Sequence, residues 1–256
     1  MNMKQECPRA SDMFQPAEEA QGEICFRGRH IMMGYLANPD LGAAHVAEIN
    51  KKNASAIDAD GWLHSGDKGC MSATGMVRIT GRYKELIIGA GGENVAPVPV
   101  EDTVKLHCEA ISNIMMVGDK RKFNVAIITL KCKGATGEEA GSSDLDGAAL
   151  SLVPGCTTVQ EACESVDFVK AIETAIKKAN ADGMCCPSNA SKIQKFTILP
   201  LDVSVNTGEL GPTLKLKRSV VAKKYSKEID ALYAPGAKNA FVNTLSVSLG
   251  EVKVTA

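Results

Sequence analysis

The sequence lacks the features that would carry the chain into or across a membrane. No run approaches the roughly 20 apolar residues that span a bilayer. The longest apolar stretches, residues 111–117 and 125–130, have the length of strands. Residues 1–8 contain no apolar signal core. We therefore expect a cytoplasmic protein, and peripheral attachment to the cytosolic face of a membrane stays open.

Patterns typical of metal sites and of nucleic-acid binding are also absent. The nine cysteines include no Cys-x-x-Cys pair, and the adjacent Cys185 and Cys186 would make a poor zinc site. The four histidines show no ligand spacing, so we predict reduced thiols and no metal site. The formal net charge of −1 gives no attraction to nucleic acid.

Hydrophobic periodicity divides the chain into two parts near Arg82. Residues before this point show the pattern of strands and turns, and residues 83–233 predict a compact α+β unit. The Gly-, Ser- and acid-rich residues 133–160 predict a solvated, mobile insertion. The elements expected in the second part are helices over 99–107, 165–182 and 219–232, a hairpin of strands 113–118 and 124–131, and a strand over 192–200.

Two segments of the first part have residues suited to a nucleotide. Gly61–Asp67 ends on Ser-Gly-Asp, and a carboxylate at a loop edge can accept both hydroxyls of a ribose. An Asp that caps its own turn is the favoured interpretation of this segment taken alone. In Thr80–Ile88, Gly81 and Lys84 could form a hinge while Arg82 faces a polar ligand. An exposed hairpin is the alternative there.

Two segments of the second part are rich in glycine or in basic residues. Gly89–Asn94 lacks both the P-loop lysine and the G-x-G-x-x-G spacing, so it predicts a flexible loop. In Gly208–Arg218, Pro212 stiffens the approach to a helix, and Lys215 and Arg218 would share one face if the helix has begun at Lys215. A mobile Lys215 could offset charge on a transferring phosphoryl group. For an isolated basic cluster, a solvated helix start is the favoured alternative.

The order and spacing of these segments resembles the C-terminal third of the adenylate-forming acyl-CoA synthetases. More narrowly, Gly22–Tyr35, Gly89–Val100 and Gly208–Arg218 resemble the bubblegum-type branch, which acts on long-chain and very-long-chain fatty acids. The resemblance covers residues 22–233. It implies that residues 1–82 are the β-rich end of a large N-terminal domain. Residues 83–256 would be its small, mobile α+β partner domain.

The resemblance also implies a two-step reaction and a role for each motif. ATP and a fatty acid give an acyl-adenylate with the help of Mg²⁺, and coenzyme A then displaces AMP. Leu214 departs from the superfamily, which usually has Gly before the catalytic lysine. The implied roles are adenylation for Lys215, ribose binding for Asp67 and Arg82, the hinge for Lys84, and coenzyme A binding for Gly91, Gly92 and Glu93.

Several family features do not appear in these residues. The phosphate loop, the adenine-binding segment and the fatty-acid tunnel would lie upstream, so we expect the isolated chain to be inactive. An alternative is a non-catalytic module that binds nucleotide or acyl-CoA, or that regulates a full-length partner. A luciferase-like or peptide-synthetase domain would share the motifs, but the string at Gly208–Arg218 argues against it.

Overall fold

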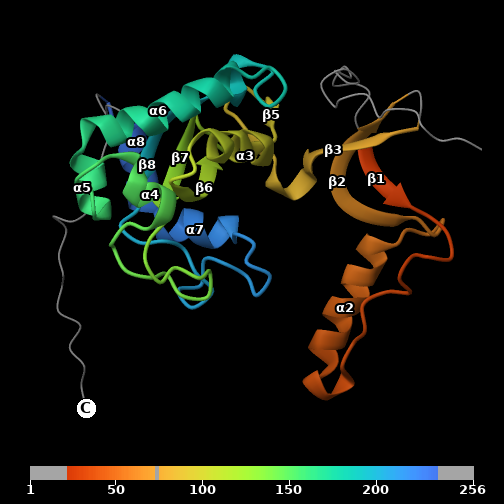
Figure 1. Cartoon of the computed structure of the whole chain (residues 1–256). Coiled ribbons are helices and arrows are strands. Elements are labelled where there is room, and N and C mark those ends of the chain that lie inside the picture. The colour runs from red at the N-terminus through yellow and green to blue at the C-terminus, as the bar shows by residue number, and fades with distance from the viewer. Residues whose placement is uncertain (1–21, 73–74, 236–256) are drawn as a thin grey trace, which may run out of the picture. The chain divides into compact units, whose positions relative to one another are not determined.

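The computed structural model describes residues 22–72 and 75–235, which form two compact units (Figure 1). The division falls between Leu86 and Ile87, four residues beyond the Arg82 boundary that the sequence predicts. None of the described helices is long and apolar enough to cross a membrane.

The first unit is a three-stranded antiparallel sheet with one helix. The strands β1 (Gly22–Phe26), β2 (Leu63–Met71) and β3 (Val77–Arg82) lie in that order, so β2 is central. Helix α2 (Ala43–Ala56) contacts β2 and follows the 3-10 turn η2 (Pro39–Leu41), which the side chain of Asn38 caps. A second 3-10 turn, η3 (Tyr83–Glu85), follows β3.

The first unit has little core of its own. Among its described apolar side chains, Cys70 is the one that is buried. Met33 and Leu36 are almost fully exposed, and Ile79 on β3 is 63% exposed. A sheet of this size normally buries one face against a second layer. The apolar side chains of this unit therefore lack the cover that such residues usually have.

The second unit is built on the sheet β6-β7-β8. Strands β6 (Ile111–Val117) and β7 (Asn124–Leu130) form the predicted antiparallel hairpin, and β8 (Ile193–Ile198) pairs with β7 in parallel. A short hairpin of β4 (Ile87–Ile88) and β5 (Asn94–Val95) precedes them. The remaining elements are α3 (Pro97–His107), α4 (Gly147–Leu152), α5 (Val159–Glu164), α6 (Val166–Ala181), η4 (Asn189–Ser191), α7 (Arg218–Lys224) and α8 (Ser226–Tyr233).

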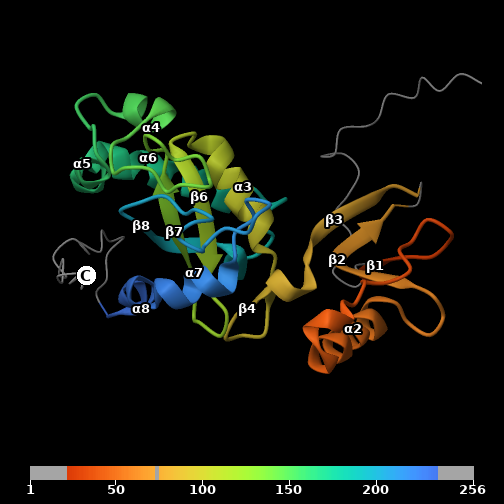
Figure 2. The same cartoon turned by 90° about the horizontal axis from the view of Figure 1, so that it is seen from below.

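Helices cover both faces of this sheet, as Figure 1 and Figure 2 show. Every residue of the central strand β7 is buried. Its Ala126 and Ile128 belong to the cluster that includes Phe168 of α6, and its Val125 and Ile127 belong to the cluster on α7 and α8. Because successive strand residues point to opposite faces, one strand contributes to both cores. Burial of each large apolar side chain contributes roughly 1.5–3 kcal/mol.

Two predicted elements of the second unit are wrong. The helix expected over 219–232 is two helices, which meet at Tyr225. Residues 133–160 are not a solvated insertion, because Leu145, Ala149 and Val159 are buried in the main core. A reciprocal capping box of Thr158 and Glu161 fixes the start of α5. The few apolar residues among the glycines and serines are enough to order this segment.

Candidate functional site

Lys215 lies near the tip of a tight hairpin that precedes α7. The amide of Gly211 donates to the carbonyl of Lys215 at 2.8 Å, and the amide of Lys217 donates to the carbonyl of Glu209 at 2.7 Å. We call residues 208–217 the Lys215 hairpin. Helix α7 begins only at Arg218, so the condition for a helix face shared by Lys215 and Arg218 is not met. The Lys215 side chain is exposed, and no hydrogen bond or ion pair to it occurs within the described residues.

The residue before Lys215 has an unusual backbone conformation. Leu214 has a φ of 57°, in the left-handed region that favours glycine. This conformation costs a residue with a side chain roughly 1–2 kcal/mol. The hairpin nevertheless holds it, with the Leu214 amide donating to the carbonyl of Gly211 at 2.8 Å. Leu214 thus replaces the superfamily's usual glycine at a position where the backbone conformation favours glycine.

A buried carboxylate anchors the first strand of the Lys215 hairpin. Glu209 is 1% exposed and accepts hydrogen bonds from Lys224 Nζ at 2.5 Å and from the Tyr225 hydroxyl at 2.9 Å. The hydroxyl of Thr207 donates to its other oxygen. Burial alone would raise the pKa of the Glu209 carboxyl, but these hydrogen bonds outweigh burial and hold the pKa below its ordinary value. The hairpin is thereby fixed to α7.

A second buried carboxylate anchors the other end of the hairpin. Arg218 donates through both terminal nitrogens to Glu101 of α3, at 2.7 and 2.5 Å. Glu101 is buried and also accepts from the backbone amide of Met116, at 2.6 Å. A bidentate pair of this kind fixes orientation as well as distance. The two anchors hold the base of the hairpin and leave Lys215 free at its tip.

Residues 137–139, in the segment that the sequence predicts to be solvated, bind the residues just before the Lys215 hairpin and lie against Leu214 within it. The amide of Val205 donates to the carbonyl of Gly137 at 2.8 Å, and the amide of Asn206 donates to the carbonyl of Glu138 at 3.1 Å. The side-chain amide of Asn206 also donates to Glu139 at 2.6 Å. A Cβ added at Gly137 would lie 3.0 Å from Leu214 Cδ2. This segment therefore packs directly against the residue that precedes Lys215.

Substitution of Gly137 tests this support. We expect Gly137→Ala to lower the free energy of unfolding by about 2–3 kcal/mol, because φ is +85° and the new Cβ would press on Leu214. Gly155→Ala is the matched control, since its φ is +92° and its added Cβ would meet nothing within 4 Å. We expect it to cost about 1–2 kcal/mol in urea unfolding. Equal losses in the two variants would contradict a role for the Leu214 contact.

Gly91, Gly92 and Glu93 form the exposed tip of the β4–β5 hairpin. The amide of Gly89 donates to the carbonyl of Glu93 at 3.1 Å, and Gly92 has a φ of +82°. The base of this hairpin is bonded to the β6–β7 turn, where Ile88 accepts from the amide of Lys120 at 2.7 Å. A tight turn thus replaces the flexible loop that the sequence predicts.

The structure brings together two of the predicted nucleotide-binding residues. Asp67 and Arg82 are directly opposite one another on β2 and β3, and Arg82 Nε donates to Asp67 Oδ1 at 2.7 Å. Asp67 therefore lies within a strand rather than at a loop edge. Lys84 belongs to η3, just after β3. Asp67, Arg82 and Lys84 are in the first unit, whereas Lys215 and Gly91–Glu93 are in the second.

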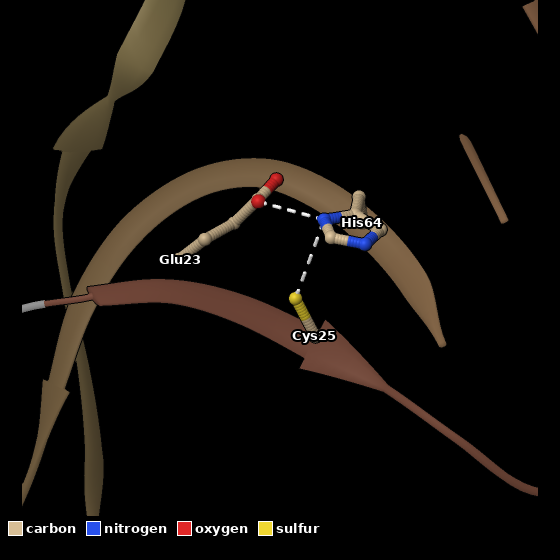
Figure 3. Close-up of side chains that lie close together, drawn as sticks. All are labelled: Glu23, Cys25 and His64. Carbon is tan, nitrogen blue, oxygen red and sulfur yellow. Dashed lines mark hydrogen bonds and ion pairs between the residues drawn. The ribbon is translucent and has the colours of Figure 1, made fainter. Parts of the chain in front are cut away.

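Sequence reasoning missed a group of side chains at the start of the first sheet (Figure 3). His64 Nδ1 lies 2.8 Å from Glu23 Oε2 and 3.7 Å from Cys25 Sγ, while its Nε2 lies 3.2 Å from Asp58 Oδ2. Hydrogen bonds to Glu23 and Asp58 raise the pKa of His64. The alternation in Glu23-Ile24-Cys25 was visible in the sequence, but the pairing of Cys25 with His64 was not.

Comparison with known proteins agrees, along most of the chain, with the resemblance to the acyl-CoA synthetases. Residues 84–237 match the AMP-binding enzyme C-terminal domain family. The chain is 48% identical over 228 residues to the long-chain-fatty-acid–CoA ligase ACSBG2 of Gallus gallus, covering 87% of this chain and 28% of the relative. It is 44% identical over 224 residues to the human ligase ACSBG1, covering 84% of this chain and 29% of the relative.

Solved structures show the same fold at lower identity. The adenylation domain of a carboxylate reductase from Mycobacterium chelonae aligns with a TM-score of 0.60 and 18% identity, over 83% of this chain and 28% of that one. The mixed α+β fold is therefore that of adenylate-forming enzymes. The chain spans less than a third of the two ligases that it resembles. By its match over residues 84–237, the chain belongs to the AMP-binding enzyme C-terminal domain family, and its relatives are long-chain-fatty-acid–CoA ligases of the bubblegum type.

Proposed function

We propose that this chain is the C-terminal part of an ATP-dependent long-chain fatty acid–CoA ligase, in which Lys215 acts during adenylation. The observation that supports this most is the presentation of Lys215. Its ammonium group is exposed at the tip of a hairpin whose base is anchored by the buried carboxylates of Glu209 and Glu101. The names of the relatives support the substrate class. The enzyme acts in the cytoplasm or at the cytosolic face of a membrane.

In this proposal, residues 1–82 are the end of the large adenylation domain and residues 83–256 are the C-terminal domain. The uncovered apolar side chains of the first unit support this assignment. Met33, Leu36 and Ile79 are exposed, and a soluble protein normally covers such a surface with further protein. The rest of the adenylation domain would supply that cover.

The residue types fit a nucleotide and its charge. Attack of a fatty acid carboxylate on the α-phosphorus concentrates negative charge, which Lys215 offsets from its exposed position. Bound Mg²⁺ would neutralise further charge on the phosphates. Asp67 accepts the ribose hydroxyls through the oxygen that Arg82 Nε does not use, and Arg82 keeps the carboxylate in place at 2.7 Å. In this proposal, Lys84 is the hinge residue, and Gly91, Gly92 and Glu93 would bind coenzyme A.

A chimeric enzyme tests the proposal directly. Residues 22–235 of this chain would replace the matching part of the Gallus gallus ligase. We expect the chimera to form acyl-CoA from ATP, coenzyme A and a long-chain fatty acid, as measured by thioester formation. A folded chimera that binds ATP and acyl-CoA but forms neither acyl-adenylate nor thioester would instead favour the non-catalytic module.

The isolated chain is expected to behave differently from the chimera. The phosphate loop and the fatty-acid tunnel are not among its residues, so the 256-residue chain should give no acyl-CoA above the background without enzyme. The check is the same thioester assay at matched concentrations, with the chimera as the positive control. Measurable turnover by the isolated chain would contradict this part of the proposal.

A further inference from the structure

We propose that Glu23, Cys25 and His64 form a zinc site in the first unit. Glu23 and Cys25 are two residues apart on β1, and although the β1–β2 register shifts between them, both side chains point toward His64 (Figure 3). His64 lies directly opposite Cys25 on β2. One donor atom from each side chain lies within 4.8 Å of the other two (Figure 3). The site follows from the pairing of the two strands and does not depend on the proposed ligase function.

The chemistry of the three donors selects the metal. A thiolate, an imidazole and a carboxylate are ligands that zinc accepts, whereas calcium and magnesium prefer oxygen alone. Zinc bonds of about 2.0–2.3 Å in a tetrahedron place donor atoms roughly 3.3–3.8 Å apart. Cys25 Sγ already lies 3.7 Å from His64 Nδ1. Glu23 Oε2 lies 2.8 Å from the same nitrogen, so it would have to move away by about 0.5–1 Å to take its place in the tetrahedron.

Neighbouring groups orient these donors in the way that metal sites require. Asp58 Oδ2 lies 3.2 Å from His64 Nε2, so a proton on Nε2 leaves the lone pair of Nδ1 for the metal. Asp58 is itself held, because its other oxygen accepts from the amides of Trp62 and Asp60 at 2.9 and 3.0 Å. The other carboxylate oxygen of Glu23, Oε1, accepts from the amide of Gly66 at 2.9 Å. An ion-paired histidine would explain the two carboxylates, but not the thiol directed at Nδ1.

Binding would release a proton from the Cys25 thiol to solvent. Zinc binds the thiolate and not the thiol. A bound ion would link β1, β2 and the turn that carries Asp58.

Cobalt substitution tests the site on the whole 256-residue chain. We expect one equivalent of Co²⁺ to give a thiolate-to-cobalt charge-transfer band that Zn²⁺ removes by displacement. Cys25→Ser and His64→Gln should each abolish the band, while Cys163→Ser and Cys185→Ser should keep it. Asp58→Asn should weaken the affinity about 10–100-fold, because the histidine loses its orienting partner.

A second measurement separates loss of the site from loss of the fold. Trp62 is the single tryptophan and belongs to the first unit, so its fluorescence reports unfolding of that unit. Zinc should raise the melting temperature of the wild-type chain and leave that of folded Cys25→Ser unchanged. A cobalt band that survives in Cys25→Ser, one that is lost in Cys185→Ser, or no band in the wild-type chain would overturn the proposal.

Discussion

Replacing Lys215 with alanine is expected to block acyl-adenylate formation in the chimeric ligase while sparing the second half-reaction. Loss of one preorganised charge-stabilising group typically slows a reaction about 10²–10³-fold, or roughly 3–4 kcal/mol in the barrier. The folded state should be unaffected, because the Lys215 side chain is exposed and no bond to it occurs in the described part of the chain. The two half-reactions are measured separately, as pyrophosphate release and as thioester formation from a supplied acyl-adenylate.

Lys217→Ala is the matched control for this variant. Lys217 is an exposed lysine on the same hairpin, two residues from Lys215. Its replacement by alanine removes the same charge from the chain. We expect it to change neither half-reaction more than about twofold. Equal loss of both half-reactions in Lys215→Ala, or equal effects of the two substitutions, would remove Lys215 from the adenylation step.

The elements that the sequence predicts correctly are those whose apolar residues follow directly from burial in the core. Strand β7 and helix α6 are examples, since β7 is buried throughout and α6 buries Phe168, Ile172 and Ile176 at helical spacing. Ser165 caps α6 where the sequence predicts its start. Such patterns are local, and they remain visible in one sequence because burial of apolar surface is the largest favourable term in folding.

The candidate site was harder to predict because it depends on contacts between distant residues. Glu101 and Arg218 are 117 positions apart, and nothing local marks Arg218 as a buried anchor rather than a solvated base. The register of β2 against β3 is likewise needed to place Asp67 beside Arg82. Residues 133–160 are rich in glycine, serine and acidic residues, and this composition predicts a solvated segment. The few apolar side chains among them, such as the fully buried Leu145, nevertheless pack into the core and order the segment. The residue types were predicted from motifs, but their surroundings required the fold.

Removal of the Glu209 carboxylate is expected to give a large loss of stability in the second unit. Glu209→Ala removes the acceptor of the Tyr225 hydroxyl and one acceptor of the Thr207 hydroxyl, and it leaves the Lys224 ammonium without its counter-ion. Breaking a buried pair from one side typically costs about 3–5 kcal/mol. Lys224 is 44% exposed and can be rehydrated, so we expect about 3 kcal/mol, at the lower end of that range.

The consequences of Glu209→Ala should reach Lys215, because the side-chain bonds of Glu209 hold in place the strand whose backbone carbonyl at position 209 accepts from the amide of Lys217. Urea unfolding followed by helix circular dichroism measures the stability, and exposed Glu164→Ala is the control, with a change within about 0.5 kcal/mol. The pKa of Glu209 is lowered in the folded chain, so its contribution is present above the ordinary carboxyl pKa and disappears as pH falls through the lower folded value. The wild-type chain and Glu209→Ala should therefore approach equal stability in acid. If Glu209→Ala is no less stable than Glu164→Ala at neutral pH, the anchor does not hold the hairpin.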